Sequence, residues 1–199
     1  MYEKLYEKIV DGLVDNGYII INDALQDEVS SDLLTRAKSI KKYKQAGISA
    51  SESLHQDANR RRDKIVWLDD ADEVERLYLD FTQGLREYIN HSLYLGLSYY
   101  EAHFALYEKG DFYEKHLDAF RGSKNRIVTT VFYLNEEWGE EDGGALIIYD
   151  EANQPITTVL PKANTLVVFL SDKFPHEVLP AKRKRHSIAG WFRVDKRDD

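Results

Sequence analysis

The sequence predicts an α+β fold: a double-stranded β-helix (jelly-roll) core braced by about three N-terminal helices. Two observations support this class. Apolar residues recur at helical spacing over about 1–95, whereas about 98–194 divides into short strand-like segments separated by turn residues. A long series of short antiparallel strands favours two facing sheets, and the open end between such sheets can hold a ligand. No repeat or linker divides the 199 residues, which predicts a single domain.

Three segments have the apolar periodicity of amphipathic helices: 2–16, about 25–44 and about 71–93. Gly17 ends the first segment. Asn22 or Asp23 is the predicted cap of the second, because a short polar side chain can accept hydrogen bonds from the first turn. Two short apolar runs, 18–21 and 65–68, are predicted to be strands.

The second half of the chain contains eight predicted strands. They span 99–107, 112–117, 126–135, 144–149, 156–160, 165–170, 175–180 and 187–194. Between the second and third helices, the polar segment 45–63 is predicted to be a mobile loop or hairpin that projects from the domain. Loops of this length are usually functional or disordered.

Composition excludes several classes of protein. The formal net charge of −8 argues against general affinity for nucleic acid. With no cysteine, disulfides and thiolate metal ligands are excluded, so a metal site must use His, Asp or Glu. There is no signal-peptide core and no apolar run long enough to span a membrane, which predicts a cytoplasmic protein without membrane contact.

His116, Asp118 and His176 are the predicted metal ligands. Two imidazoles and one carboxylate can occupy one face of an octahedral metal, the arrangement of non-heme Fe(II) oxygenases. On an extended strand, His116 and Asp118 would share a face. A second His-x-Asp, His55-Gln56-Asp57, lies in the polar loop without flanking strand residues, so we do not assign it to the metal.

Arg185 is the predicted partner of a dicarboxylate cosubstrate. Its guanidinium is permanently charged and has the fork geometry that carboxylates accept, and it follows His176 closely in the chain. Tyr133 could donate a phenol hydrogen bond to the same carboxylate, and Tyr107 could contact the metal-side end of the cosubstrate. His103 is expected to pack or face solvent, and His186 to be structural.

Five motifs occur in order along the chain. They are Arg62-Asp63-Lys64-Ile65-Val66-Trp67, Arg126 to Asn135, Asp142-Gly143-Gly144-Ala145-Leu146, His176-Glu177-Val178-Leu179-Pro180-Ala181 and Arg185-His186-Ser187-Ile188-Ala189-Gly190-Trp191-Phe192. Together they resemble the prolyl 4-hydroxylase domain family of 2-oxoglutarate dioxygenases. The resemblance covers about residues 10–194 and extends to bacterial counterparts of the hypoxia-sensing hydroxylases.

This resemblance implies roles for individual residues. The iron ligands would be His116, Asp118 and His176. Arg185 and Tyr133 would hold the distal carboxylate of 2-oxoglutarate, and Tyr107 would lie near the cosubstrate. Trp191 matches a pocket tryptophan, and Arg62 begins the segment that closes the substrate loop. These last two residues are the predicted substrate contacts.

The resemblance also implies the reaction: trans-4-hydroxylation of a prolyl residue, with succinate and carbon dioxide as coproducts. The cofactors would be Fe(II), 2-oxoglutarate and dioxygen, with ascorbate as a stimulant. The partner would be a protein with an exposed proline, with a translation elongation factor as the candidate. Two alternatives stay open: the same chemistry on another side chain or a small molecule, and a non-catalytic jelly-roll module with a structural metal.

Overall fold

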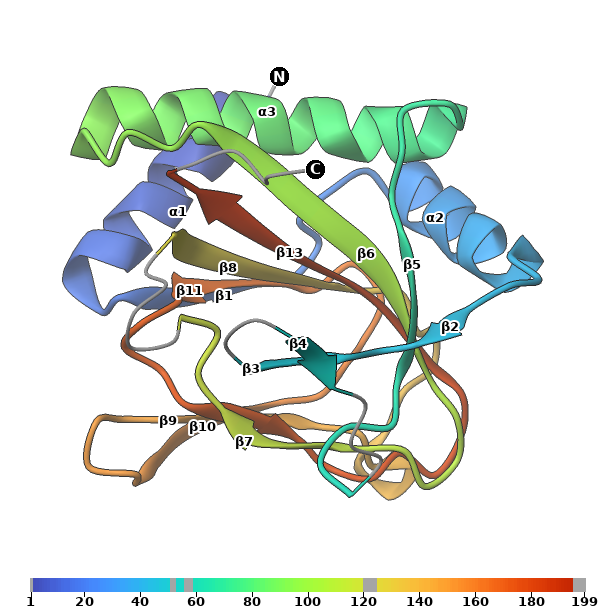
Figure 1. Cartoon of the computed structure of the whole chain (residues 1–199). Helices are drawn as coiled ribbons and strands as arrows, with labels where there is room; N and C mark the ends of the chain where they lie inside the picture. The colour runs from blue at the N-terminus through green and yellow to red at the C-terminus, as the bar shows by residue number, and fades with distance from the viewer. Residues whose placement is uncertain (1, 51–52, 56–58, 120–124, 195–199) are drawn as a thin grey trace.

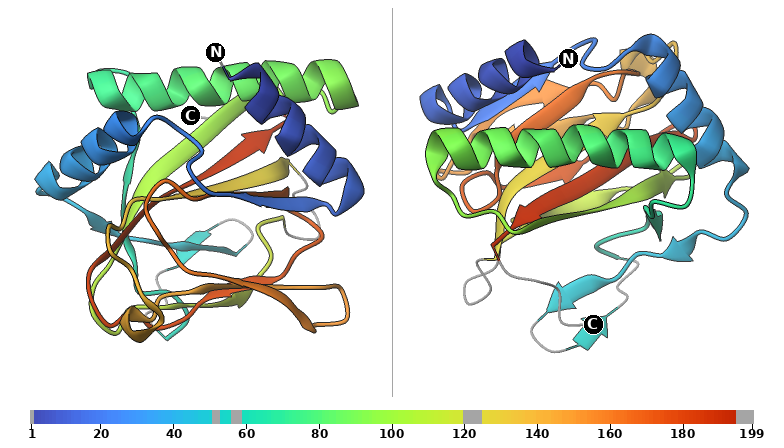
Figure 2. Two further views of the ribbon diagram at one scale, coloured as in Figure 1. Left: turned by 180° about the vertical axis from the view of Figure 1, so that it is seen from behind. Right: turned by 90° about the horizontal axis from the view of Figure 1, so that it is seen from above.

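The computed structural model describes residues 2–50, 53–55, 59–119 and 125–194. Three helices, α1 (Glu3–Asp15), α2 (Asp27–Ser39) and α3 (Glu73–Leu93), lie on the outer face of a large sheet (Figures 1 and 2). Their apolar faces share one core with the side chains that this sheet presents outward, among them Phe104, Phe132 and Phe192. The helices therefore brace the sheet, as the sequence predicts.

The large sheet has seven strands in the order β1-β11-β8-β13-β6-β5-β2, and every pairing is antiparallel. Its strands are β1 (Tyr18–Ile21), β2 (Lys44–Gln45), β5 (Lys64–Trp67), β6 (Tyr99–Tyr107), β8 (Arg126–Tyr133), β11 (Leu166–Leu170) and β13 (Arg185–Arg193).

A smaller, four-stranded sheet faces the large one in the order β10-β9-β12-β7. Its strands are β7 (Tyr113–His116), β9 (Leu146–Tyr149), β10 (Pro155–Val159) and β12 (His176–Val178). A second apolar core, which includes Val131, Ile148 and Phe169, fills the space between the sheets. Two facing antiparallel sheets confirm the predicted jelly roll, and all eight strands predicted beyond residue 98 are present.

The segment 45–63 contains a separate two-stranded hairpin, β3 (Ile48–Ala50) with β4 (Ser53–His55). Before the hairpin, β2 pairs with β5, so the start of this segment belongs to the large sheet. A short 3₁₀ helix, Glu140–Asp142, precedes β9. None of the described helices has the length and apolar character needed to cross a membrane.

The predicted cap of the second helix is wrong. Gln26, not Asn22 or Asp23, is the N-cap residue of α2, and its side chain makes no capping hydrogen bond. The amide of Asn164, which follows β10, instead accepts from the Leu25 backbone N–H at 2.9 Å and donates to the Leu25 carbonyl at 2.8 Å. The start of α2 is thus held by a side chain from the β-core.

Candidate functional site

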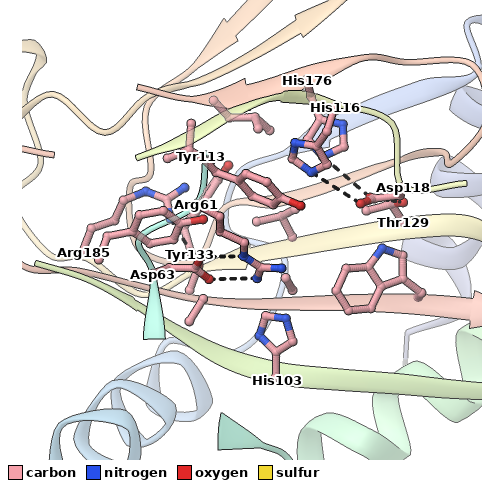
Figure 3. A pocket seen from close by; sticks show the side chains of 18 of the residues that line it. Arg61, Asp63, His103, Tyr113, His116, Asp118, Thr129, Tyr133, His176 and Arg185 are labelled. Carbon is pink, nitrogen blue, oxygen red and sulfur yellow. Dashed lines mark hydrogen bonds and ion pairs between the residues drawn. The ribbon is translucent and has the colours of Figure 1, made fainter. Parts of the chain in front are cut away.

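The predicted metal ligands come together where β7 meets β12. His116 is the last residue of β7, His176 is the first of β12, and the two lie directly opposite each other in the antiparallel pairing. Asp118 lies just beyond β7, and its carboxylate oxygens are 3.6 Å from Nε2 of each histidine. One ligand atom from each of the three residues lies within 4.8 Å of the others. Figure 3 shows both imidazoles turned toward Asp118.

Backbone carbonyls fix the tautomer of both histidines. Nδ1 of His116 is 2.7 Å from the Glu114 carbonyl, and Nδ1 of His176 is 3.0 Å from the Phe174 carbonyl. Because a carbonyl oxygen only accepts, each Nδ1 carries the proton and each Nε2 presents a lone pair. Burial, together with His116, lowers the pKa of His176 to about 4. His176 is therefore neutral at neutral pH, the form that binds a metal.

Asp118 is held in its ionised form. Burial opposes the charge, but His176 is itself charged at the low pH where Asp118 would take up a proton, and its attraction, with a contribution from His116, outweighs burial and holds the pKa of this carboxyl well below its usual range. Thr129 Oγ1, on β8, donates to Asp118 Oδ2 at 2.8 Å and also lies 2.8 Å from the Ser171 hydroxyl. This donor set of two imidazoles and one oriented carboxylate fits Fe(II) with open coordination positions.

Thr129→Val tests the orienting role of Thr129. The substitution keeps the shape and removes the donor to Asp118, so we expect metal affinity to fall about 10-fold. Anaerobic calorimetric titration with Fe(II) measures the change. Thr130→Val is the matched control, because Thr130 is equally buried and its hydroxyl bonds Tyr100. Equal metal affinity in both variants would contradict the role of Thr129.

Arg185 lies in the same pocket and is 1% exposed. Its Nε donates to the Gly144 carbonyl at 2.9 Å and its Nη1 to Ser187 Oγ at 3.2 Å. Gly144 has φ +66°, and a Cβ there would come within 3.0 Å of the Arg185 side chain, so glycine is needed at this close approach. Within the part of the chain that the structure describes, no carboxylate pairs with Arg185.

Two tyrosines face this guanidinium. The ring centroids of Tyr107 and Tyr133 lie 4.7 and 5.0 Å from the Arg185 guanidinium carbon. Burial raises the pKa of Tyr133 to about 12, with Arg185 opposing, so the phenol keeps its proton. The Tyr133 hydroxyl is fully buried and has no hydrogen-bond partner among the described residues. A buried cation without a carboxylate, beside an unsatisfied phenol, fits one end of a dicarboxylate.

Of the two predicted substrate contacts, Trp191 lines the pocket and Arg62 does not. The Arg62 guanidinium carbon instead lies 4.9 Å from the Phe112 ring centroid. Its neighbour Arg61 turns inward: it bonds both oxygens of the fully buried Asp63, at 2.6 and 2.9 Å, and lies over the Tyr113 ring. Arg62 therefore lies outside the pocket lining, where Asp63 holds Arg61 instead, and its contact with substrate stays a prediction.

Several pocket residues have no counterpart in the sequence-based prediction: Arg61, Asp63, His103, Tyr113, Arg126 and Thr129. The Tyr113 ring stacks on His116, with centroids 3.6 Å apart. The strand periodicity carried a signal for Thr129, because it shares a face of β8 with Val131 and Tyr133. His186 lies outside the pocket lining, as predicted, whereas most of the alternative motif His55-Gln56-Asp57 lies outside the described residues.

Known proteins share the sequence and the fold of this chain. The profile of the 2OG-Fe(II) oxygenase superfamily matches residues 102–193. A crystal structure of a Pseudomonas putida prolyl-4-hydroxylase is 37% identical, with a TM-score of 0.88 over 96% of this chain and 100% of that one. A Trichoplax adhaerens prolyl hydroxylase in complex with a hypoxia inducible factor oxygen degradation domain peptide fragment is 27% identical, with a TM-score of 0.86 over 96% of this chain and 90% of that one.

Curated relatives agree with these structures. The hypoxia-inducible factor prolyl hydroxylase of Caenorhabditis elegans is 30% identical and Egl nine homolog 1 of Homo sapiens 29% identical, each over 94% of this chain. The chain spans 28% and 46% of their respective lengths. The superfamily match and the group of three metal donors identify Fe(II) and 2-oxoglutarate as the cofactors. The chain belongs to the prolyl 4-hydroxylase domain family of 2OG-Fe(II) oxygenases.

Proposed function

We propose that this protein hydroxylates C4 of a prolyl residue in a protein substrate, using 2-oxoglutarate and dioxygen and releasing succinate and carbon dioxide. The observation that carries this proposal is the joint placement, in one pocket, of three metal donors and an arginine that pairs with no carboxylate among the residues that the structure describes. Similarity to a prolyl-4-hydroxylase over that enzyme's full length supports proline as the target.

His116, Asp118 and His176 would hold Fe(II). When bound, Fe(II) and 2-oxoglutarate supply the oxidising chemistry. The chain supplies the geometry: the carbonyls behind each Nδ1 aim both imidazoles, and Thr129 aims Asp118. With three protein ligands, coordination positions would stay open for the cosubstrate and dioxygen.

Arg185 and Tyr133 would bind the distal carboxylate of 2-oxoglutarate. Burial strengthens these hydrogen bonds, because water does not compete for the carboxylate there. Tyr107, on the neighbouring strand β6, would contact the cosubstrate closer to the metal. Arg185, Tyr133 and Tyr107 all line the pocket that contains the three metal donors. One molecule of 2-oxoglutarate could therefore contact both Arg185 and the metal.

The substrate peptide would enter beside Trp191, which supplies an apolar surface for the prolyl ring. We propose that the 45–63 segment covers the bound peptide and that all 199 residues form one catalytic domain. A translation elongation factor with an exposed proline is the first candidate substrate, and such a partner would place the enzyme in the cytoplasm.

Mass spectrometry tests this proposal. Purified elongation factor, and separately a hypoxia inducible factor oxygen degradation domain peptide, would be incubated with the enzyme, Fe(II), 2-oxoglutarate and ascorbate in air. We expect a mass increase of one oxygen atom on one proline that requires 2-oxoglutarate. If the added oxygen atom lies on another side chain, that residue, and not proline, would be the target. Succinate formation stimulated only by small metabolites would point to a small-molecule substrate.

A further inference from the structure

His103 is a buried histidine in the pocket that neither the metal site nor the cosubstrate site uses. It lies on β6 and faces the pocket together with Ala105 and Tyr107, since alternate residues of a strand share a face. His103 is only 2% exposed. The pocket therefore contains a third imidazole beyond the two that face Asp118 (Figure 3).

Two tryptophans hold the His103 ring. Trp67 lies opposite His103 in the β5–β6 pairing, with ring centroids 5.2 Å apart and an interplanar angle of 85°. Trp191, on β13, lies on the other side, at 5.4 Å and 55°. Contacts from both neighbouring strands restrict rotation of the imidazole, so its nitrogen atoms have defined directions.

The position of the proton on His103 follows from its neighbours. Nδ1 is 3.3 Å from the Phe104 carbonyl, which can only accept, so Nδ1 donates and Nε2 keeps a lone pair. Burial, followed by the charge of Arg61, lowers the pKa of His103 to about 3, although Asp63 opposes this. The imidazole is neutral at neutral pH, and its Nε2 can accept but not donate a hydrogen bond.

The two carboxylates of the pocket already have partners. Both oxygens of Asp63 accept from Arg61. Asp118 accepts from Thr129 and faces the two histidines of the metal site. Among the lining residues that the structure describes, His103 is the one imidazole outside the metal site. Its Nε2 is thus available to a hydrogen-bond donor on the substrate.

We infer that His103 is a specificity-determining residue whose Nε2 accepts a hydrogen bond from the peptide N–H that follows the target proline. This inference rests on the proposed function. The nitrogen of proline has no hydrogen, so it cannot be the donor. The N–H of the next residue is the nearest donor in the chain, separated from the prolyl ring by one carbonyl group. A substrate lacking this N–H would leave a buried acceptor unsatisfied.

A matched pair of small ligands tests the inference. N-acetyl-proline methylamide and N-acetyl-proline methyl ester differ only in an N–H replaced by oxygen. Each would be titrated into the anaerobic complex of enzyme, Fe(II) and 2-oxoglutarate, with perturbation of its visible absorption band as the readout. We expect the wild-type enzyme to bind the amide about tenfold more tightly than the ester.

Three variants give the comparison its controls. His103→Leu should reduce the amide-to-ester ratio to about one, and His103→Gln, which keeps an acceptor, should restore part of it. His186→Leu should keep the wild-type ratio, because His186 is similarly buried but lies outside the pocket lining. A general loss of packing would weaken both ligands equally and leave the ratio unchanged.

The outcomes separate the inference from the proposed function. A wild-type enzyme that hydroxylates a protein proline but binds both ligands equally would overturn the role of His103 alone. The role of His103 would also be overturned if His103→Leu keeps the wild-type ratio of amide to ester affinity. Absence of prolyl hydroxylation, together with no binding of either ligand, would overturn the proposed function and the inference with it.

Discussion

Asp118→Ala is expected to abolish turnover of 2-oxoglutarate while the protein stays folded. Asp118 supplies the one carboxylate among the three metal donors, and both histidines face it at 3.6 Å. Its loss should weaken Fe(II) binding by more than the roughly 10–100-fold that follows loss of an outer partner of a ligand. The Thr129 hydroxyl keeps one hydrogen-bond partner, the Ser171 hydroxyl, which limits the cost of losing its acceptor on Asp118.

Succinate formation in air measures turnover. Without oxygen, Fe(II) and then 2-oxoglutarate are added, and the visible charge-transfer band of the chelate reports assembly of the metal site. Asp172→Ala is the matched control, because it removes an exposed carboxylate close in sequence to His176 and should keep the band. Circular dichroism and thermal unfolding report the fold. A folded Asp118→Ala protein with full turnover would remove Asp118 from the metal site. An apo-protein that unfolds on this substitution would favour a structural role.

Arg185→Ala should produce the second large effect, a loss of affinity for 2-oxoglutarate. The guanidinium is buried, and removing a charge-assisted hydrogen bond costs about 1.5–3 kcal/mol, which corresponds to roughly 10–100-fold in affinity. Pyruvate has the same 2-oxo acid group but no distal carboxylate. The wild-type protein should therefore prefer 2-oxoglutarate strongly over pyruvate, and the variant should lose most of this preference.

Competition between the two oxo acids for the Fe(II) complex measures that preference directly. Lys184→Ala is the control, because its exposed side chain precedes Arg185 and carries the same charge. Arg185→Lys keeps the charge but loses the fork, so an intermediate preference is expected. An unchanged preference in a folded Arg185→Ala protein would locate the distal carboxylate elsewhere in the pocket.

Elements with strong periodicity were predictable from the sequence, and long-range side-chain contacts were not. The helices and the eight strands of the second half follow local patterns of apolar residues, so they lie close to their predicted positions. The start of α2 depends on Asn164, far along the chain, which no local capping rule can identify. The mistaken choice of Asn22 or Asp23 has this cause.

The residues of the site likewise divide into those that could be predicted from the sequence and those that depend on long-range contacts. His116, Asp118, His176 and Arg185 were recognisable because few residue types can bind a metal or a carboxylate, and their spacing fits strands. Arg60, Arg61 and Arg62 are chemically equivalent in sequence, so only the buried Asp63 and the ring of Tyr113 decide which arginine enters the pocket. His103 was missed as a pocket residue because its tryptophan neighbours come from two other strands.

The direct pairing of His116 with His176 gives the metal a role in choosing the strand register. A slip of one residue between β7 and β12 would turn one imidazole to the opposite face of the sheet and separate the donors. A bound ion therefore stabilises the native alignment alone, and contributes nothing to misaligned forms of the small sheet. Metal binding would therefore favour correct folding, because it stabilises only those chains in which β7 and β12, which are distant in sequence, have paired in the native register.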